Sequence, residues 1–124
     1  MTRILIGGFL IAHGLVHIGM WGVPKLQTAE GSPFVSSHSW LIGSTKGLAA
    51  VLGVLTAVVL IAGGVALFAH SGLWRPLTIV GLAGSLFLDV LYFNPWFIFI
   101  TVVNGAFLWA LVWAHWPAAS RVGA

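Results

Sequence analysis

The sequence has no cysteine and very few charged residues. Among its 124 residues, charged side chains make up 6% and hydrophobic side chains 60%. The missing cysteines exclude disulfide bonds, thiol redox chemistry, iron–sulfur ligation and thiolate zinc sites in this chain. A soluble domain has about a quarter of its residues charged, so this chain cannot cover a water-facing surface. It is also too apolar for a disordered chain. The composition therefore predicts an integral membrane protein.

Basic residues outnumber acidic residues by five to two, which gives a formal net charge of +3. Such a surplus can indicate nucleic-acid binding. Here, however, the basic residues lie at the ends of apolar runs, where lysine and arginine anchor helices at lipid headgroups. We therefore expect the lipid bilayer as a partner, and no nucleic acid.

Four apolar runs are long enough to cross a membrane as helices. They cover residues 4–21, 48–69, 77–93 and 96–116. A helix rises about 1.5 Å per residue, so about 20 residues cross a hydrocarbon core about 30 Å thick. None of the runs alternates in polarity as barrel strands do. We predict an all-α fold in which residues 1–124 form one transmembrane domain. That domain is an antiparallel four-helix bundle with an outer loop over residues 22–43.

Charges at the ends of the runs predict the orientation. Three arginines, Arg3, Arg75 and Arg121, fall on one side of the predicted bundle, and Lys25 and Lys46 fall on the other. The positive-inside rule assigns the side with more basic residues to the cytoplasm. We therefore expect a multi-pass protein of the bacterial inner membrane with both termini in the cytoplasm.

Small residues recur four positions apart in and beside the apolar runs. In lipid, such spacing lets two helix backbones approach closely, because packing rather than the hydrophobic effect holds the helices together. Three pairs are candidates for close helix contacts, namely Gly43 with Gly47, Gly53 with Ala57, and Gly81 with Ser85.

A few polar side chains interrupt the apolar runs at similar predicted depths. His13 and His17 are one turn apart on one face of the first helix. Asp89 is the single acid inside a run, and a carboxylate at that depth needs a partner. In an antiparallel bundle Asp89 is level with His17, and Asn104 is nearly level with His13. We predict one polar cluster in the outer half of the bundle, with Asp89 bonded to His17 and the loop residue His38 closing the site.

This cluster has a structural and a functional interpretation. It either holds the helices together or binds a quinone headgroup or a proton. Histidines four apart can also share a metal, but Gly14-Leu15-Val16 between them contains no glutamate, so no hydrolase motif is present. His70 and His115 end two runs, whereas histidines that ligate a transmembrane haem usually sit deeper. Quinone and lipid are therefore the candidate cofactors, and haem and metal are disfavoured.

The first apolar run carries Arg3, Gly7, His13 and Gly14 in sequence. With these residues it resembles the first helix of the DoxX-like family of small four-helix bacterial membrane proteins. DoxX-like proteins are associated with quinone-linked sulfur oxidation and with membrane redox assemblies. The resemblance implies an accessory role near quinone chemistry and carries over no catalytic residue. The whole chain, including the junctions at residues 74–76 and 94–96, also looks like small four-helix proteins of actinobacteria and related bacteria.

We expect no catalytic activity of the chain's own, because no nucleophile–base pair, carboxylate dyad or glycine-rich phosphate loop is visible. Three functions stay open. The first is a small non-catalytic accessory subunit of a larger membrane complex, such as a respiratory or photosynthetic one, associated with other subunits or with itself. The second is a quinone- or metal-binding redox protein that uses the cluster of His13, His17, Asp89 and Asn104. The third is a homo-oligomeric small transporter that uses Asp89.

Overall fold

The computed structural model describes residues 1–22 and 38–123, and these residues are mostly helical. A short antiparallel hairpin, β1 (His38–Ser39) with β2 (Gly43–Ser44), precedes the second long helix. The helical elements are α1 (Thr2–His17), the π-helical turn η1 (Ile18–Gly22), α2 (Lys46–Phe68), α3 (Trp74–Leu91), the 3-10 turn η3 (Pro95–Phe97), α4 (Ile98–Val112) and α5 (Ala119–Val122).

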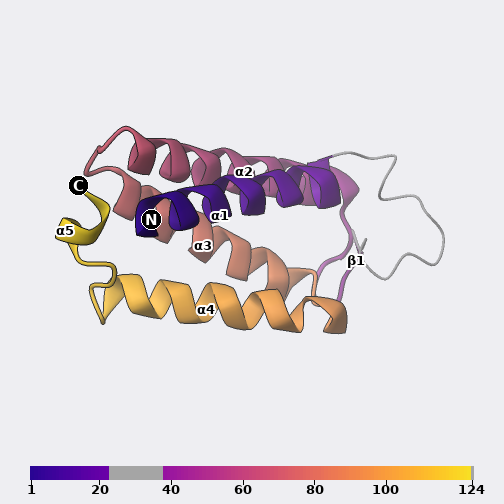
Figure 1. Ribbon diagram of the computed structural model, residues 1–124. Coiled ribbons are helices and arrows are strands. Elements are labelled where there is room, and N and C mark those ends of the chain that lie inside the picture. Colours follow the sequence, from indigo (N-terminus) through magenta and orange to yellow (C-terminus); the bar gives the residue numbers. More distant parts are fainter. Residues whose placement is uncertain (23–37, 124) are drawn as a thin grey trace.

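The four long helices run alongside one another (Figure 1). α2 packs against both α1 and α3, and α4 packs against α3. The short helix α5 lies at one end of the helices, and β1 lies at the opposite end (Figure 1). Three segments are long and apolar enough to cross a membrane, namely Thr2–Trp21, Gly47–Phe68 and Trp74–Leu91, whereas α4 is apolar but shorter.

The first three helices begin and end within three residues of the predicted runs 4–21, 48–69 and 77–93 once η1 is counted with α1. The fourth differs, because the predicted run 96–116 contains a helix only over Ile98–Val112. Pro95 starts a 3-10 turn before that helix, and His115 adopts a positive φ of 48° after it. Hydropathy alone predicted neither the 3-10 turn at Pro95 nor the positive φ of His115. It also did not predict α5 or the β1–β2 hairpin. Residues 23–37 of the predicted outer loop lie outside the described residues.

Glycines bring the backbones of α1 and α2 into contact. A Cβ atom built on Gly14 would lie 2.8 Å from the carbonyl oxygen of Ala57. A Cβ atom on Gly64 would lie 2.8 Å from the carbonyl oxygen of Gly7. Both distances are shorter than a carbon–oxygen contact allows, and the obstacle in each case is backbone. These positions therefore require glycine for α1 and α2 to pack at this separation.

Two of the three predicted small-residue pairs lie in buried helix contacts. Gly53 packs against Trp21, and Gly81 packs against Leu60. The second members of these pairs, Ala57 and Ser85, are also buried, four residues further along the same helices. The remaining pair does not form a close contact. A Cβ atom on Gly47 would meet nothing within 4 Å, and Gly43 precedes α2 with a φ of 74°.

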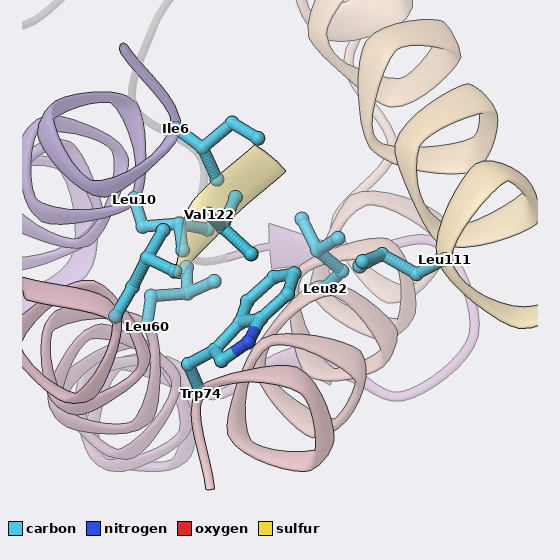
Figure 2. Close-up of a cluster of buried hydrophobic side chains, with 8 residues drawn as sticks. Ile6, Leu10, Leu60, Trp74, Leu82, Leu111 and Val122 are labelled. Carbon is cyan, nitrogen blue, oxygen red and sulfur yellow. The ribbon is translucent and has the colours of Figure 1, made fainter. Parts of the chain in front are cut away.

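The buried apolar side chains form two clusters. One lies toward the α5 end, where Trp74 and Val122 point into it together with side chains from α1 to α4 (Figure 2). The other lies toward the opposite end of the helices, near the β1–β2 hairpin. The first cluster consists of Ile6, Leu10, Leu60, Leu67, Trp74, Leu82, Leu111 and Val122, and the second of Trp21, Ala49, Leu88, Leu91, Tyr92 and Phe97. In sequence, four buried polar residues fall between the residues of the two clusters, namely His13 and His17 on α1, Ser85 on α3 and Asn104 on α4.

Arg75 ties the end of α4 to the start of α3. Its Nη1 donates a hydrogen bond to the carbonyl oxygen of Leu111 at 3.1 Å. Its Nη2 donates to the carbonyl oxygens of His115 at 3.2 Å and Pro117 at 2.9 Å. The guanidinium also lies 5.5 Å from the centre of the Trp74 ring. Arg75 thus satisfies carbonyl groups that have no partner within a helix.

Candidate functional site

A buried hydrogen-bond network joins α1, α3 and α4, and Ser85 lies at its centre. The Ser85 Oγ atom lies 2.9 Å from Nε2 of His17 and 3.3 Å from Nε2 of His13. It also accepts a hydrogen bond of 2.7 Å from Nδ2 of Asn104. All four side chains are buried. One hydroxyl group therefore links both histidines of α1 to the amide of α4.

The single hydrogen of the Ser85 hydroxyl gives the two histidines different roles. A hydroxyl can donate one hydrogen bond and accept two. The hydroxyl therefore donates to the Nε2 atom of only one histidine. Asn104 already occupies one of the two acceptor positions, so the other histidine donates its own Nε2–H to the second position. Neutral His13 and His17 therefore carry their protons on different ring nitrogens.

Asp89 extends the network toward the hairpin end. Its Oδ2 atom accepts hydrogen bonds from Nδ2 of Asn104 at 3.4 Å and from Oγ1 of Thr101 at 3.2 Å. These donors fix the orientation of the Asn104 amide, since a flipped amide would turn its oxygen toward the carboxylate. Asp89 thus meets neutral donors from α4, and the network connects it to His13 and His17 through Asn104 and Ser85.

Two buried polar atoms of this network have no hydrogen-bond partner within the described part of the chain. They are Nδ1 of His17 and Oδ1 of Asn104. Leaving such an atom without a partner costs about 1–3 kcal/mol, and native structures contain few of them. The two atoms come from α1 and α4, the two helices that flank Ser85. Each of these atoms is a position at which a further polar group can complete the network.

Aromatic rings extend the two histidines into a ladder along α1 and η1. Phe9 stacks on His13 with ring centres 5.4 Å apart, and His13 meets His17 edge-on at 5.0 Å. His17 in turn stacks on Trp21 at 5.0 Å. The four residues are spaced four apart, so they lie along one face of the helix. Trp21 also packs against Phe97, just before α4, at 5.9 Å.

An apolar groove lies between α1 and α4 beside this ladder. Its volume is about 440 Å³, and it is open to the surface of the protein. Phe9 and Phe107 line the groove and pack against each other with ring centres 5.9 Å apart. The same Phe9 ring stacks on His13, so the groove borders the polar network. The other lining residues are Leu5, Ile6, Val103, Ala106, Ala110 and Trp116.

The structure brings together His13, His17, Asp89 and Asn104, four of the five residues in the predicted cluster. The predicted direct bond between Asp89 and His17 is wrong, because Ser85 and Asn104 lie between them in the network. The fifth residue, His38, is exposed on β1, where its Nδ1 atom lies 3.1 Å from Oγ of Ser44. The prediction that His38 closes the site is therefore wrong, because His38 lies outside the buried network.

Sequence reasoning missed Ser85 and Thr101 as members of the site. Ser85 lies one helical turn before Asp89, and Thr101 lies about one turn before Asn104, so each shares a helix face with a predicted residue. That spacing was a usable signal. The spacing of Gly81 and Ser85 instead predicts only a packing role for this serine.

The histidines considered for haem lie near the α5 end. The His70 ring accepts a hydrogen bond from the Arg3 guanidinium, and its Nδ1 atom lies 2.7 Å from the carbonyl oxygen of Gly123. His115 is exposed beyond α4. Within residues 1–22 and 38–123, no group of three histidine, cysteine or acidic side chains could hold a metal ion.

The DoxX-like resemblance of the first run stays a prediction, and the function has to be inferred from the geometry of the site. No family model, curated protein or solved structure matches this chain.

Proposed function

We propose that the chain is a four-helix, multi-pass protein of the bacterial inner membrane that binds a quinone. In this proposal the quinone headgroup lies at the network around Ser85, and the isoprenoid tail lies in the groove between α1 and α4. One observation carries the proposal: an open apolar groove borders a buried network in which two polar atoms have no partner among residues 1–22 and 38–123. A quinone has the matching amphiphilic form, with a polar ring and a long apolar tail.

The membrane location is supported by the helices and by their outer surfaces. Three segments are long and apolar enough to cross a bilayer. Large apolar side chains point outward, including Phe99 at 77% exposure and Trp113 at 68%. α4 has 15 residues, or about 22 Å of helix, which is shorter than the hydrocarbon core of about 30 Å. A crossing by α4 therefore includes the residues that flank it or a locally thinner bilayer.

An even number of crossings is supported by the position of the chain ends. The His70 ring contacts both the Arg3 guanidinium and the carbonyl oxygen of Gly123. Arg3 is at the start of α1, and Gly123 follows α5, so α4 returns the chain to the end where α1 begins. Both ends of the chain then lie on one side of the membrane. The arginines near them favour the cytoplasmic side.

The unpartnered atoms suit the reduced form of the headgroup. The Oδ1 atom of Asn104 can only accept a hydrogen bond, so its partner must be a donor such as a quinol hydroxyl. When Ser85 donates to Nε2 of His17, the Nδ1 atom of His17 carries the proton and donates. When Nε2 of His17 instead donates to Ser85, Nδ1 is an acceptor. A quinol hydroxyl can satisfy either form, because it both donates and accepts. The rings of Phe9 and Phe107 would supply apolar walls beside it.

Filling the groove tests this proposal. We expect Ala110→Phe to weaken binding of a long-tailed quinone by roughly tenfold, the effect of about 1.4 kcal/mol, because the new ring takes the place of the tail. Binding of a tailless quinone should not change. The measurement is the quinone retained by purified protein, together with titration of both quinones. Ala114→Phe is the matched control, because Ala114 is exposed beyond α4 and does not line the groove. Equal binding by both variants would contradict the location of the tail.

An accessory subunit remains the second candidate, and the surface of α4 favours it. Only Asn104 and Leu111 are buried on this helix, while Ile98, Phe99, Val102 and Trp109 are exposed. Such a face can be covered by lipid or by another membrane subunit.

Native mass spectrometry of protein released from its own membranes in mild detergent separates the two candidates. An accessory subunit should appear in a complex far heavier than a small homo-oligomer, and its other components would identify the assembly. A monomer or dimer without other chains would contradict the accessory role. If that species carries the excess mass of a quinone, the first candidate is supported directly.

A further inference from the structure

A second cavity, separate from the groove, lies at the end of the molecule where the two ends of the described chain meet. Its volume is about 220 Å³. Arg3 from α1 and Arg121 from α5 both line it, together with Met1, Ile4, Val122 and Gly123. Two guanidinium groups from distant parts of the sequence thus face one small polar space.

Hydrogen bonds hold α5 against the start of α1. The Arg3 guanidinium donates to the His70 ring. The Nδ1–H of His70 then donates to the carbonyl oxygen of Gly123 over 2.7 Å. Gly123 has a φ of 68°, and a Cβ atom there would lie 3.1 Å from Nδ1 of His70. Val122, one residue earlier, is buried in the apolar cluster of Figure 2. Together these contacts fix the segment that carries Arg121.

No carboxylate neutralises these two arginines within residues 1–22 and 38–123. Asp89 is the only acid in that part of the chain, and it bonds to Asn104 and Thr101. Arg75, the third arginine, bonds to carbonyl oxygens at the end of α4. The cavity between Arg3 and Arg121 therefore carries positive charge for which the described protein supplies no anion.

We propose that this cavity binds the phosphate group of an anionic phospholipid headgroup. The planar donors of two guanidinium groups match phosphate oxygens well. Ile4 lines the cavity and is exposed on α1, where it can contact an acyl chain. Anionic lipids are enriched on the cytoplasmic side, to which the arginines assign this end. The inference rests on the proposed membrane location and is independent of the quinone site.

The test is lipid retention by the whole protein, measured by native mass spectrometry from micelles containing equal amounts of phosphatidylglycerol and phosphatidylcholine. We expect the protein to retain phosphatidylglycerol preferentially. Arg121→Gln should reduce that retention by roughly tenfold, because it removes a charge-assisted hydrogen-bond donor. Arg121 is exposed on α5, so this variant should fold even if Arg3→Gln does not. Lys46→Gln is the control, because Lys46 begins α2, whereas the cavity lies near His70, just after the other end of this helix. The control therefore removes one positive charge away from the cavity.

Each alternative outcome overturns a stated part of the proposal. Equal retention of the two lipids, or equal loss in Arg121→Gln and Lys46→Gln, would show that no specific site exists. Displacement of phosphatidylglycerol by inorganic phosphate at the same concentration would assign the cavity to free phosphate instead of lipid. Ala110→Phe should leave lipid retention unchanged while it weakens quinone binding, which distinguishes failure of this site from failure of the quinone site.

Discussion

Gly14→Ala should destabilise the protein by about 1–3 kcal/mol, the usual effect of forcing extra atoms into a packed interior. The added Cβ atom would lie 2.8 Å from the carbonyl oxygen of Ala57 and 2.7 Å from Cγ1 of Ile61. The Ile61 side chain can rotate, but the Ala57 carbonyl belongs to the backbone of α2 and cannot. α1 must therefore move away from α2, which loosens other contacts along the same interface, including that of Gly64 with Gly7.

The matched control is Gly8→Ala on the same helix. A Cβ atom on Gly8 would meet nothing within 4 Å, so no clash is expected. Alanine should stabilise the helix there by up to about 1 kcal/mol, because it has a higher helix propensity than glycine. Thermal unfolding of both variants in the same detergent measures the difference. If Gly14→Ala unfolds at the temperature of Gly8→Ala or above it, the close contact between α1 and α2 is wrong.

Ser85→Ala should have the largest effect at the candidate site. It removes the one hydroxyl that His13, His17 and Asn104 share. Each buried polar group left without a partner costs about 1–3 kcal/mol, so we expect a clear loss of thermal stability. We also expect quinone binding to weaken by at least roughly tenfold, because the imidazole and the amide would no longer be held in position.

Both quantities can be measured on one preparation, as the unfolding temperature and the quinone retained after purification. Ser120→Ala is a suitable control, because Ser120 is exposed on α5 and far from Ser85 in sequence. Unchanged stability in Ser85→Ala would contradict the shared hydrogen bonds. Lower stability with unchanged quinone binding would leave the network as a purely structural link between helices.

The sequence predicted the long helices well because apolar run length is a direct requirement of a helix that crosses a bilayer. It did less well for α4. The run from 96 to 116 is continuously apolar, but backbone geometry at Pro95 and His115 limits the helix to Ile98–Val112. Hydropathy does not encode such limits. The small-residue pattern likewise indicated Gly53 and Gly81 correctly, yet it missed the backbone contacts of Gly14 and Gly64, which have no small residue four positions away.

For the site, counting residues from the ends of the runs was enough to bring His13, His17, Asp89 and Asn104 to one region. The count gives depth along each helix but not rotation about its axis. The hydrogen-bond partners therefore could not be assigned, and the expected pair of Asp89 and His17 proved wrong. Ser85 takes that place because it lies one turn from Asp89 on α3.

The two sides of α1 differ in how firmly they are held, and this has a mechanical consequence. Toward α2, backbone meets backbone at Gly14 and Gly64, so any widening there is opposed by many short contacts. Toward α4, Phe9 contacts Phe107, and in the adjoining turns Trp21 of η1 contacts Phe97 of η3, each pair with ring centres 5.9 Å apart. Rings can separate by rotating their side chains, whereas backbones cannot. A bulky guest in the groove can therefore be accommodated by rotation of the Phe9 and Phe107 rings, while Arg75 and Asn104 keep α4 bonded to α3.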